Sequence, residues 1–112
     1  MSVRITRAAD APAYHPPRHD GVAATRLQGH EAGATEKFWI GMSVYEPGGS
    51  AAESPAGKET VYIVLDGELT VTAEGESTVL GRHDSVHLTE GTVRSVENRS
   101  DRPATLLVAI AL

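Results

Sequence analysis

The hydrophobic pattern of the chain is that of short β-strands separated by turns. The clearest case is residues 37–46, where two sets of side chains alternate. One set is Phe38, Ile40, Met42 and Val44, and the other is Trp39, Gly41, Ser43 and Tyr45. A period of two predicts a strand with two distinct faces. Because the first set is uniformly apolar, we expect it to face the core.

The rest of the chain continues this pattern. Residues 22–29 read as a strand, and the β-branched runs on either side of Asp66-Gly67 predict a hairpin with its turn at that pair. A second hairpin turn is expected at residues 74–76, and at least four short strands follow it. The small and polar residues 50–59 are not expected to form a strand. Closely spaced strands predict a sandwich or small barrel.

The chain has the length of one domain. Its 112 residues are expected to form a single core, with residues 1–20 as an extended N-terminal arm and residues 21–112 as the barrel domain. A helical turn near residues 8–13 is the most helix that the pattern allows. The N-terminus lacks the apolar stretch of a signal peptide, and no run is apolar enough for a spanning helix. We therefore expect a cytoplasmic protein that does not bind membranes.

The net charge of the chain argues against one class of binding partner. Ten Lys and Arg against fifteen Asp and Glu give a formal net charge of −5. This is the wrong sign for a protein that neutralises nucleic-acid phosphates, so no nucleic-acid partner is expected. The chain has no cysteine, which excludes disulfides, thiolate metal sites and a cysteine nucleophile.

Two motifs resemble those of the cupin family, whose members are antiparallel jelly-roll β-barrels. The family's first motif, G-x5-H-x-H-x3-E-x6-G, aligns with Gly48, Ser54, Ala56, Thr60 and Gly67. Its second motif, G-x5-P-x-G-x2-H-x3-N, aligns with His83, Thr89, Gly91, Arg94 and Asn98. The resemblance covers roughly residues 37–110 and implies an all-β, single-domain cupin barrel.

The residues that bind metal in many cupins are replaced in this sequence. Ser54, Ala56 and Thr60 stand at three of the four ligand positions, and Arg94 stands at the last histidine position. Small neutral side chains are poor ligands, and a guanidinium would repel a dication. We therefore expect a pocket without a metal or other cofactor. The five histidines are expected on the solvated surface, and Glu53 and Glu59, which flank motif positions, are only weak candidates for ligands or acid–base groups.

By the same alignment, the inward-facing residues define a candidate binding pocket. Thr60, Tyr62 and Arg94 are predicted to line it, with Phe38, Ile40 and Met42 as its floor. Such a pocket suits an uncharged or acidic organic molecule, whose carboxylate Arg94 would bind. Alternatively, Arg94 forms an ion pair with Glu53 or Glu59.

Three classes of function are compatible with this sequence. The first is a metal-free cupin that binds a small molecule without catalysis. The second is a metal-independent enzyme of isomerase, epimerase, lyase or cyclase type, with Tyr62 or Glu59 transferring protons and Arg94 stabilising negative charge. The third is a metal enzyme with a degenerate site.

Apolar residues are also predicted on the outside of the barrel. Val61, Ile63 and Leu65 form an outward row, and Trp39 and Tyr45 are expected on the outer face of their strand. A large apolar patch would be left in water. We therefore expect a homodimer, formed through sheet faces or exchanged N-terminal strands.

Overall fold

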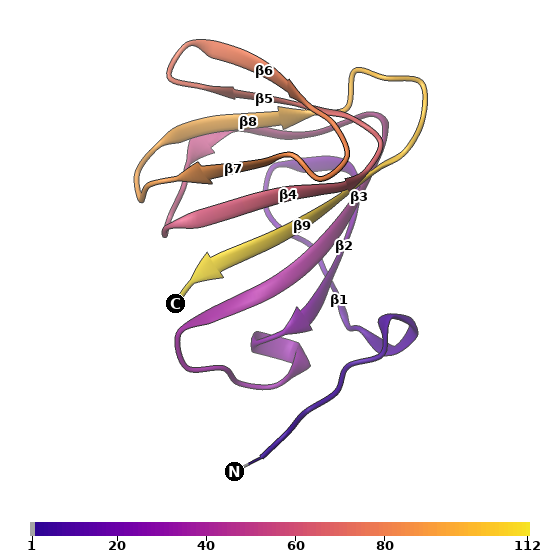
Figure 1. Cartoon of the computed structure of the whole chain (residues 1–112), viewed down its shortest axis with the longest axis vertical. Helices are drawn as coiled ribbons and strands as arrows, with labels where there is room; N and C mark the ends of the chain where they lie inside the picture. The colour runs from indigo at the N-terminus through magenta and orange to yellow at the C-terminus, as the bar shows by residue number, and fades with distance from the viewer. Residues whose placement is uncertain (1) are drawn as a thin grey trace.

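The structure is a computed structural model and describes residues 2–112. It is an all-β jelly roll with two short 3-10 helices, and all of its strand pairs are antiparallel (Figure 1). The first half of the chain forms η1 (Ala8–Asp10), β1 (Ala13–Tyr14), β2 (His19–Gln28), η2 (His30–Ala32), β3 (Phe38–Pro55) and β4 (Thr60–Asp66). The second half forms β5 (Leu69–Ala73), β6 (Glu76–Leu80), β7 (Ser85–Leu88), β8 (Val93–Glu97) and β9 (Ala104–Ala111). No helix within residues 2–112 is long and apolar enough to cross a membrane.

The long strand β3 joins the two sides of the barrel. The strands follow the order β6-β5-β8-β3-β9-β4-β7, and β2 pairs with β3 outside this path. Residues 38–45 of β3 pair with β9, whereas residues 50–55 pair with β8. The prediction that residues 50–59 form no strand is therefore wrong for residues 50–55. Small side chains such as Ala51, which is 1% exposed, fit where β3 bends from one side of the barrel to the other.

The two predicted hairpins have different outcomes. The turn at residues 74–76 is confirmed, because β5 pairs with β6 and both Glu74 and Gly75 have positive φ. The hairpin at Asp66-Gly67 is wrong, because β4 pairs with β7 and β9 while β5 pairs with β6 and β8. Gly67, at φ +77°, is instead a corner between the two sides, where an added Cβ would lie 2.7 Å from the Pro103 carbonyl oxygen.

The core lies between the two sides of the barrel. Its fully buried side chains include Tyr45, Val64 and Leu106 from one side and Leu69 and Val96 from the other. The predicted inward direction of Tyr62 and Val64 is confirmed by their burial.

The predicted facing of β3 is wrong. Trp39 and Tyr45 are buried inside, whereas Phe38 is 53% exposed and Met42 is half-buried on the outer face. An alternating pattern defines two faces but does not determine which one is inward. The reason lies at Gly41, where an added Cβ would come within 2.7 Å of the Trp39 ring, so the glycine leaves room for that ring inside the barrel.

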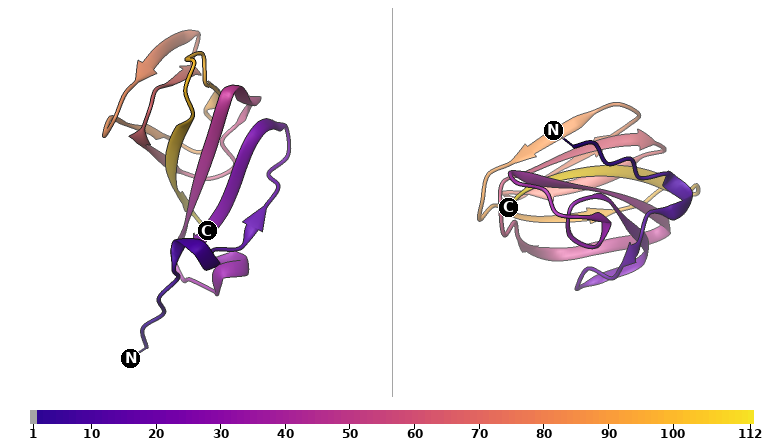
Figure 2. Two further views of the ribbon diagram at one scale, coloured as in Figure 1. Left: turned by 90° about the vertical axis from the view of Figure 1, so that its right-hand side faces the viewer. Right: turned by 90° about the horizontal axis from the view of Figure 1, so that it is seen from below.

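The N-terminal segment packs on the barrel at one end. Figure 1 and Figure 2 show that it leaves the barrel beside β1 and that its first residues extend away from the strands. β1 pairs with β2, and the Arg4 guanidinium donates to the carbonyl oxygens of Gly33 and Ala34, each at 2.9 Å. The helical turn expected near residues 8–13 is confirmed by η1. Residues 14–19, which connect β1 to the start of β2, are called the strap below.

Candidate ligand cavity

One cavity of about 460 Å³ lies between the strap and the inner face of the barrel. Its walls come from β2, β3, β4, β8 and β9 together with the whole strap. The barrel contributes Arg26, Trp39, Ser43, Tyr45, Ser54, Pro55, Tyr62, Arg94, Leu106, Val108 and Ile110. A volume of this size accommodates a small organic molecule.

Arg94 is at the centre of a polar cluster on the cavity wall. The register of β3 and β8 pairs Ser54 with Arg94, and Arg94 Nη1 donates to Ser54 Oγ at 2.6 Å. Arg94 Nε donates to the Tyr62 hydroxyl oxygen at 3.0 Å. Since both hydroxyl oxygens accept from Arg94, their own protons are free to be donated to a ligand. The cluster is therefore a set of hydrogen-bond donors around a positive charge.

Arg94 has no carboxylate partner among residues 2–112. The alternative of an ion pair with Glu53 or Glu59 is not realised, and no Asp or Glu is among the described residues that line the cavity. A partly buried guanidinium that contacts only neutral oxygens retains its attraction for an anion. The cavity is thus electropositive although the chain carries a formal charge of −5.

A second group of lining residues, Tyr14, Arg26 and Trp39, is held together by aromatic contacts and is called the aromatic wall below. The Arg26 guanidinium carbon lies 3.6 Å from the centre of the Tyr14 ring and 4.3 Å from that of the Trp39 ring. The two rings are perpendicular, with centroids 5.8 Å apart, and Arg26 also pairs with Glu31 at 3.2 Å. These contacts attach the strap to the barrel through Tyr14. Burial raises the pKa of the Tyr14 and Tyr45 hydroxyls, so both remain protonated at neutral pH.

The strap also brings a histidine to the cavity. His19 is half-buried, and its Nδ1 lies 2.8 Å from the Pro17 carbonyl oxygen. A carbonyl oxygen can only accept, so Nδ1 carries a proton and Nε2 has a free lone pair when the ring is neutral. Burial lowers the pKa of His19, the bond to Pro17 opposes this, and the nearby positive charge of Arg94 lowers it further. His15 lines the cavity as well but is exposed, as predicted for the histidines, so the half-buried His19 is the one that departs from that prediction.

The predicted site residues are divided between different parts of the molecule. Arg94 and Tyr62 line the cavity, as predicted. Thr60 is buried, but its hydroxyl donates to the Lys58 carbonyl at 2.9 Å and lies outside this cavity. The predicted floor is wrong: Phe38, Ile40 and Met42 are absent from the lining, because the other face of β3 is turned inward.

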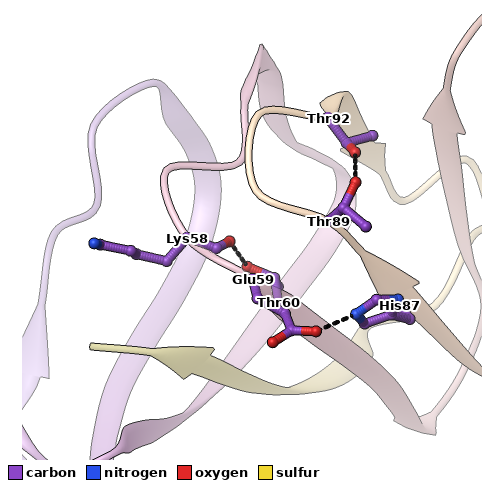
Figure 3. A network of polar contacts seen from close by, with 6 residues as sticks. All are labelled: Lys58, Glu59, Thr60, His87, Thr89 and Thr92. Atoms are coloured by element: carbon purple, nitrogen blue, oxygen red, sulfur yellow. Dashed lines mark hydrogen bonds and ion pairs between the residues drawn. The ribbon is translucent and has the colours of Figure 1, made fainter.

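Glu59 is on the outer surface of the barrel. Its Oε2 lies 2.6 Å from His87 Nε2, and the side chains are 64% and 53% exposed, respectively (Figure 3). Glu59 directly precedes β4 and reaches His87 on β7, where Val61 pairs with His87. Glu59 does not line the cavity, so it is not the proton-transfer group of that site. The outward direction predicted for His87 is confirmed.

The strap and the aromatic wall were missed by sequence reasoning. Residues 1–20 show no periodicity, so nothing local indicated that His19 would contribute to the cavity. Trp39 could have been found, because a single tryptophan alternating with Gly41 and Ser43 suggests a ring that packs over small neighbours.

The residues at the family's metal-ligand positions do not fit a divalent cation. Arg94 brings a positive charge within 2.6 Å of Ser54 Oγ, Ala56 has no ligating atom, and the Thr60 hydroxyl is bonded to the backbone. Within residues 2–112, no three His, Asp or Glu side chains are gathered as a metal site requires. Chemistry at this cavity therefore falls to the chain's own side chains.

Comparison with known proteins agrees with this architecture. The family model described as Cupin_2, a cupin domain, matches residues 41–110. The chain belongs to the cupin family. This cupin is 58% identical over 109 residues to a Mycobacterium tuberculosis protein named beta-D-galactosidase Rv1717, covering 97% of this chain and 94% of that protein. It is 29% identical over 112 residues to the tetracenomycin polyketide synthase protein TcmJ of Streptomyces glaucescens, covering 98% and 72% of the two chains.

Solved structures share the fold of this cupin at low sequence identity. The polyketide cyclase RemF from Streptomyces resistomycificus has a TM-score of 0.83 at 17% identity, covering 99% of this chain and 80% of that one. A predicted oxalate decarboxylase from Thermotoga maritima has a TM-score of 0.81 at 20% identity, covering 96% and 98%. At these identities the likeness establishes the barrel and says nothing about substrates.

Proposed function

We propose that this cupin binds a β-D-galactoside in the cavity and hydrolyses its glycosidic bond without a metal. The observation that carries the proposal is the 58% identity, over nearly the full length of both chains, to a protein named beta-D-galactosidase. The cavity supports it. A pyranose ring has apolar C–H faces that pack on aromatic rings such as Trp39 and hydroxyl oxygens that accept hydrogen bonds from the Arg94 cluster.

The chemistry differs from that of most glycosidases. Those enzymes use two carboxyl groups, one on each side of the scissile bond. No described residue lining this cavity is Asp or Glu, so other groups take these roles. Tyr62 donates its hydroxyl proton to the departing oxygen, and Arg94, 3.0 Å from the Tyr62 oxygen, stabilises the negative charge that remains.

Arg94 also favours an acidic substrate. Its charge has no carboxylate partner among residues 2–112, so a carboxylate on the ligand would supply the missing one. Methyl β-D-galacturonide, in which the sugar carries a 6-carboxylate, is expected to bind more tightly than methyl β-D-galactoside. A charge-assisted hydrogen bond is worth roughly 1.5–3 kcal/mol, or about 10-fold or more in Kd.

The experiment is a calorimetric titration together with hydrolysis of an aryl β-D-galactoside. The protein is titrated with methyl β-D-galactoside, its galacturonide and the corresponding glucoside. Arg94→Met is expected to abolish the preference for the galacturonide and to lower the rate, whereas Arg82→Met, which changes an exposed arginine outside the cavity, leaves both unchanged. Absence of galactoside binding and of hydrolysis by the wild-type protein would overturn the proposal.

A second candidate is the binding of an aromatic polyketide. It is favoured by the aromatic wall formed by Tyr14 and Trp39 and by the 29% identity to a polyketide synthase protein. A planar polyphenol titrated in the same way distinguishes the two candidates. Tight binding of the polyphenol with no response to any galactoside would favour this second function.

A further inference from the structure

Hydrolysis in this cavity requires a group that accepts a proton. Its arginines are permanently charged, and burial keeps the Tyr14 and Tyr45 hydroxyls protonated. With no described Asp or Glu in the lining, two histidines of the strap remain, His15 and His19. His15 is exposed, whereas His19 is half-buried.

Both the backbone and the ring of His19 are held in place by hydrogen bonds. Its backbone pairs with Ala51 of β3, and the Ala52 N–H donates to the carbonyl oxygen of Arg18 at 2.9 Å. Its ring is oriented by the bond from Nδ1 to the Pro17 carbonyl oxygen. The proton-free Nε2 is consequently the atom available to a reacting group, and no hydrogen bond within residues 2–112 occupies it.

The groups around His19 favour its neutral form. Arg94 on β8 is the charge that acts on it most directly, and the other charged or titratable groups lining the cavity belong to the strap, β2, β3 and β4. These are Tyr14, His15 and Arg18 on the strap, Arg26 on β2, Tyr45 on β3 and Tyr62 on β4. None of them is an acid that would stabilise a protonated imidazole as an ion pair. Desolvation by burial is the largest cause of the lowered pKa of His19, the bond to the Pro17 carbonyl opposes it, and the charge of Arg94 adds to it.

We propose that His19 Nε2 is the general base that takes a proton from the attacking water. This inference rests on the proposed galactoside hydrolysis. The water oxygen forms a bond to the anomeric carbon as its proton passes to His19. The bond from that carbon to the leaving oxygen breaks, and the leaving oxygen takes its electron pair and the Tyr62 proton. His19 then loses its proton to solvent and Tyr62 regains one, so no further reactant is needed.

The test compares His19→Asn with His83→Asn, which changes an exposed histidine outside the cavity. The amide nitrogen of the introduced asparagine can still donate to the Pro17 carbonyl, so the His19→Asn variant keeps the strap contact while it removes Nε2. We expect His19→Asn to bind methyl β-D-galactoside within about 2-fold of the wild type and to lose roughly 100-fold or more in kcat. The wild-type kcat/KM should rise with pH as His19 loses its proton, below the usual histidine pKa. That limb should vanish in His19→Asn and remain in His83→Asn.

The outcomes separate this inference from the proposed function. A wild-type protein that neither binds nor hydrolyses galactosides overturns both. A wild-type protein that hydrolyses them, with the same pH limb and rate in His19→Asn, overturns only the role of His19. A His19→Gln variant provides the check on folding: if both variants are native by circular dichroism but lose binding and rate in equal proportion, His19 binds substrate and is not the base. Partial recovery of the His19→Asn rate by added imidazole would support the base.

Discussion

The contact between Tyr14 and Arg26 is expected to decide whether the strap stays closed over the cavity. We predict that Tyr14→Leu releases the strap while the barrel remains folded. Arg26 lies 3.6 Å from the Tyr14 ring centre, and its side chain is only 15% exposed, so the cation–π interaction is near the strong end of its range. Tyr14→Phe keeps the aromatic ring and serves as the matched control.

The size of the effect follows from two contacts. A largely desolvated cation–π pair contributes about 1–2 kcal/mol. The perpendicular Tyr14–Trp39 pair, at 5.8 Å, adds about 0.5–1.5 kcal/mol. Because leucine retains part of the apolar contact, we take a loss of about 2 kcal/mol, which corresponds to a roughly 30-fold larger open population of the strap.

Hydrogen exchange measures this population directly. The Arg26 N–H donates to the Pro12 carbonyl at 2.8 Å, so its amide reports on the attachment of the segment that leads into the strap. In Tyr14→Leu this amide should exchange roughly 30-fold faster, while amides of β4 and β9 keep their protection. Tyr14→Phe should resemble the wild type. Equal exchange rates of the Arg26 amide in all three proteins would refute the idea that the contacts of the Tyr14 ring with Arg26 and Trp39 hold the strap.

Three further predictions concern the fold and assembly. Gly67→Ala should lower the free energy of unfolding by about 3 kcal/mol, because it adds a backbone clash to the strain of positive φ. Gly75→Ala, at φ +79° with nothing within 4 Å, should lower it by about 1 kcal/mol. Equal midpoints of urea unfolding for the two variants would contradict this. Asn98→Ala should lower the free energy of unfolding by about 3 kcal/mol in the same assay, because this residue is 1% exposed and its side-chain amide donates to the Tyr45 and Arg102 carbonyls. A loss below about 1 kcal/mol would show that these hydrogen bonds contribute little to stability. We also expect a homodimer through the half-buried outer row Val61, Ile63 and Leu65, and a light-scattering mass of one 11.8 kDa chain at micromolar concentration would exclude it.

The sequence predicted the barrel better than it predicted the cavity. Motif spacing predicted that Arg94 and Tyr62 face the cavity, and both line it. Antiparallel pairing of β3 with β8 brings Ser54 beside Arg94 whichever side chains stand there. Local sequence patterns gave wrong predictions where the structure depends on contacts with segments distant in the sequence. The inward face of β3 is determined by the fit of Trp39 over Gly41, and the Asp66-Gly67 corner is determined by its packing against Pro103.

Local sequence patterns did not predict the position of the strap for a related reason. Its residues are ordered by single contacts with β2 and β3 and not by a repeating hydrophobic face. The bond between His19 and the Pro17 carbonyl, for example, depends on the left-handed backbone of the residue between them, Arg18, at φ 59°. A short non-periodic segment gives no signal of such an arrangement until the surface that it covers is known.

The position of the strap in the chain has a consequence for how this protein's chemistry could diverge. The part that matches the cupin domain is residues 41–110, yet nearly half of the residues lining the cavity, including His19, Arg26 and Trp39, precede it. Two proteins that share every residue of the part matching the cupin domain would therefore still differ in the cavity wall through their first forty residues. Exchange of the strap alone between related cupins offers a way to transfer specificity while the paired strands that support folding stay unchanged.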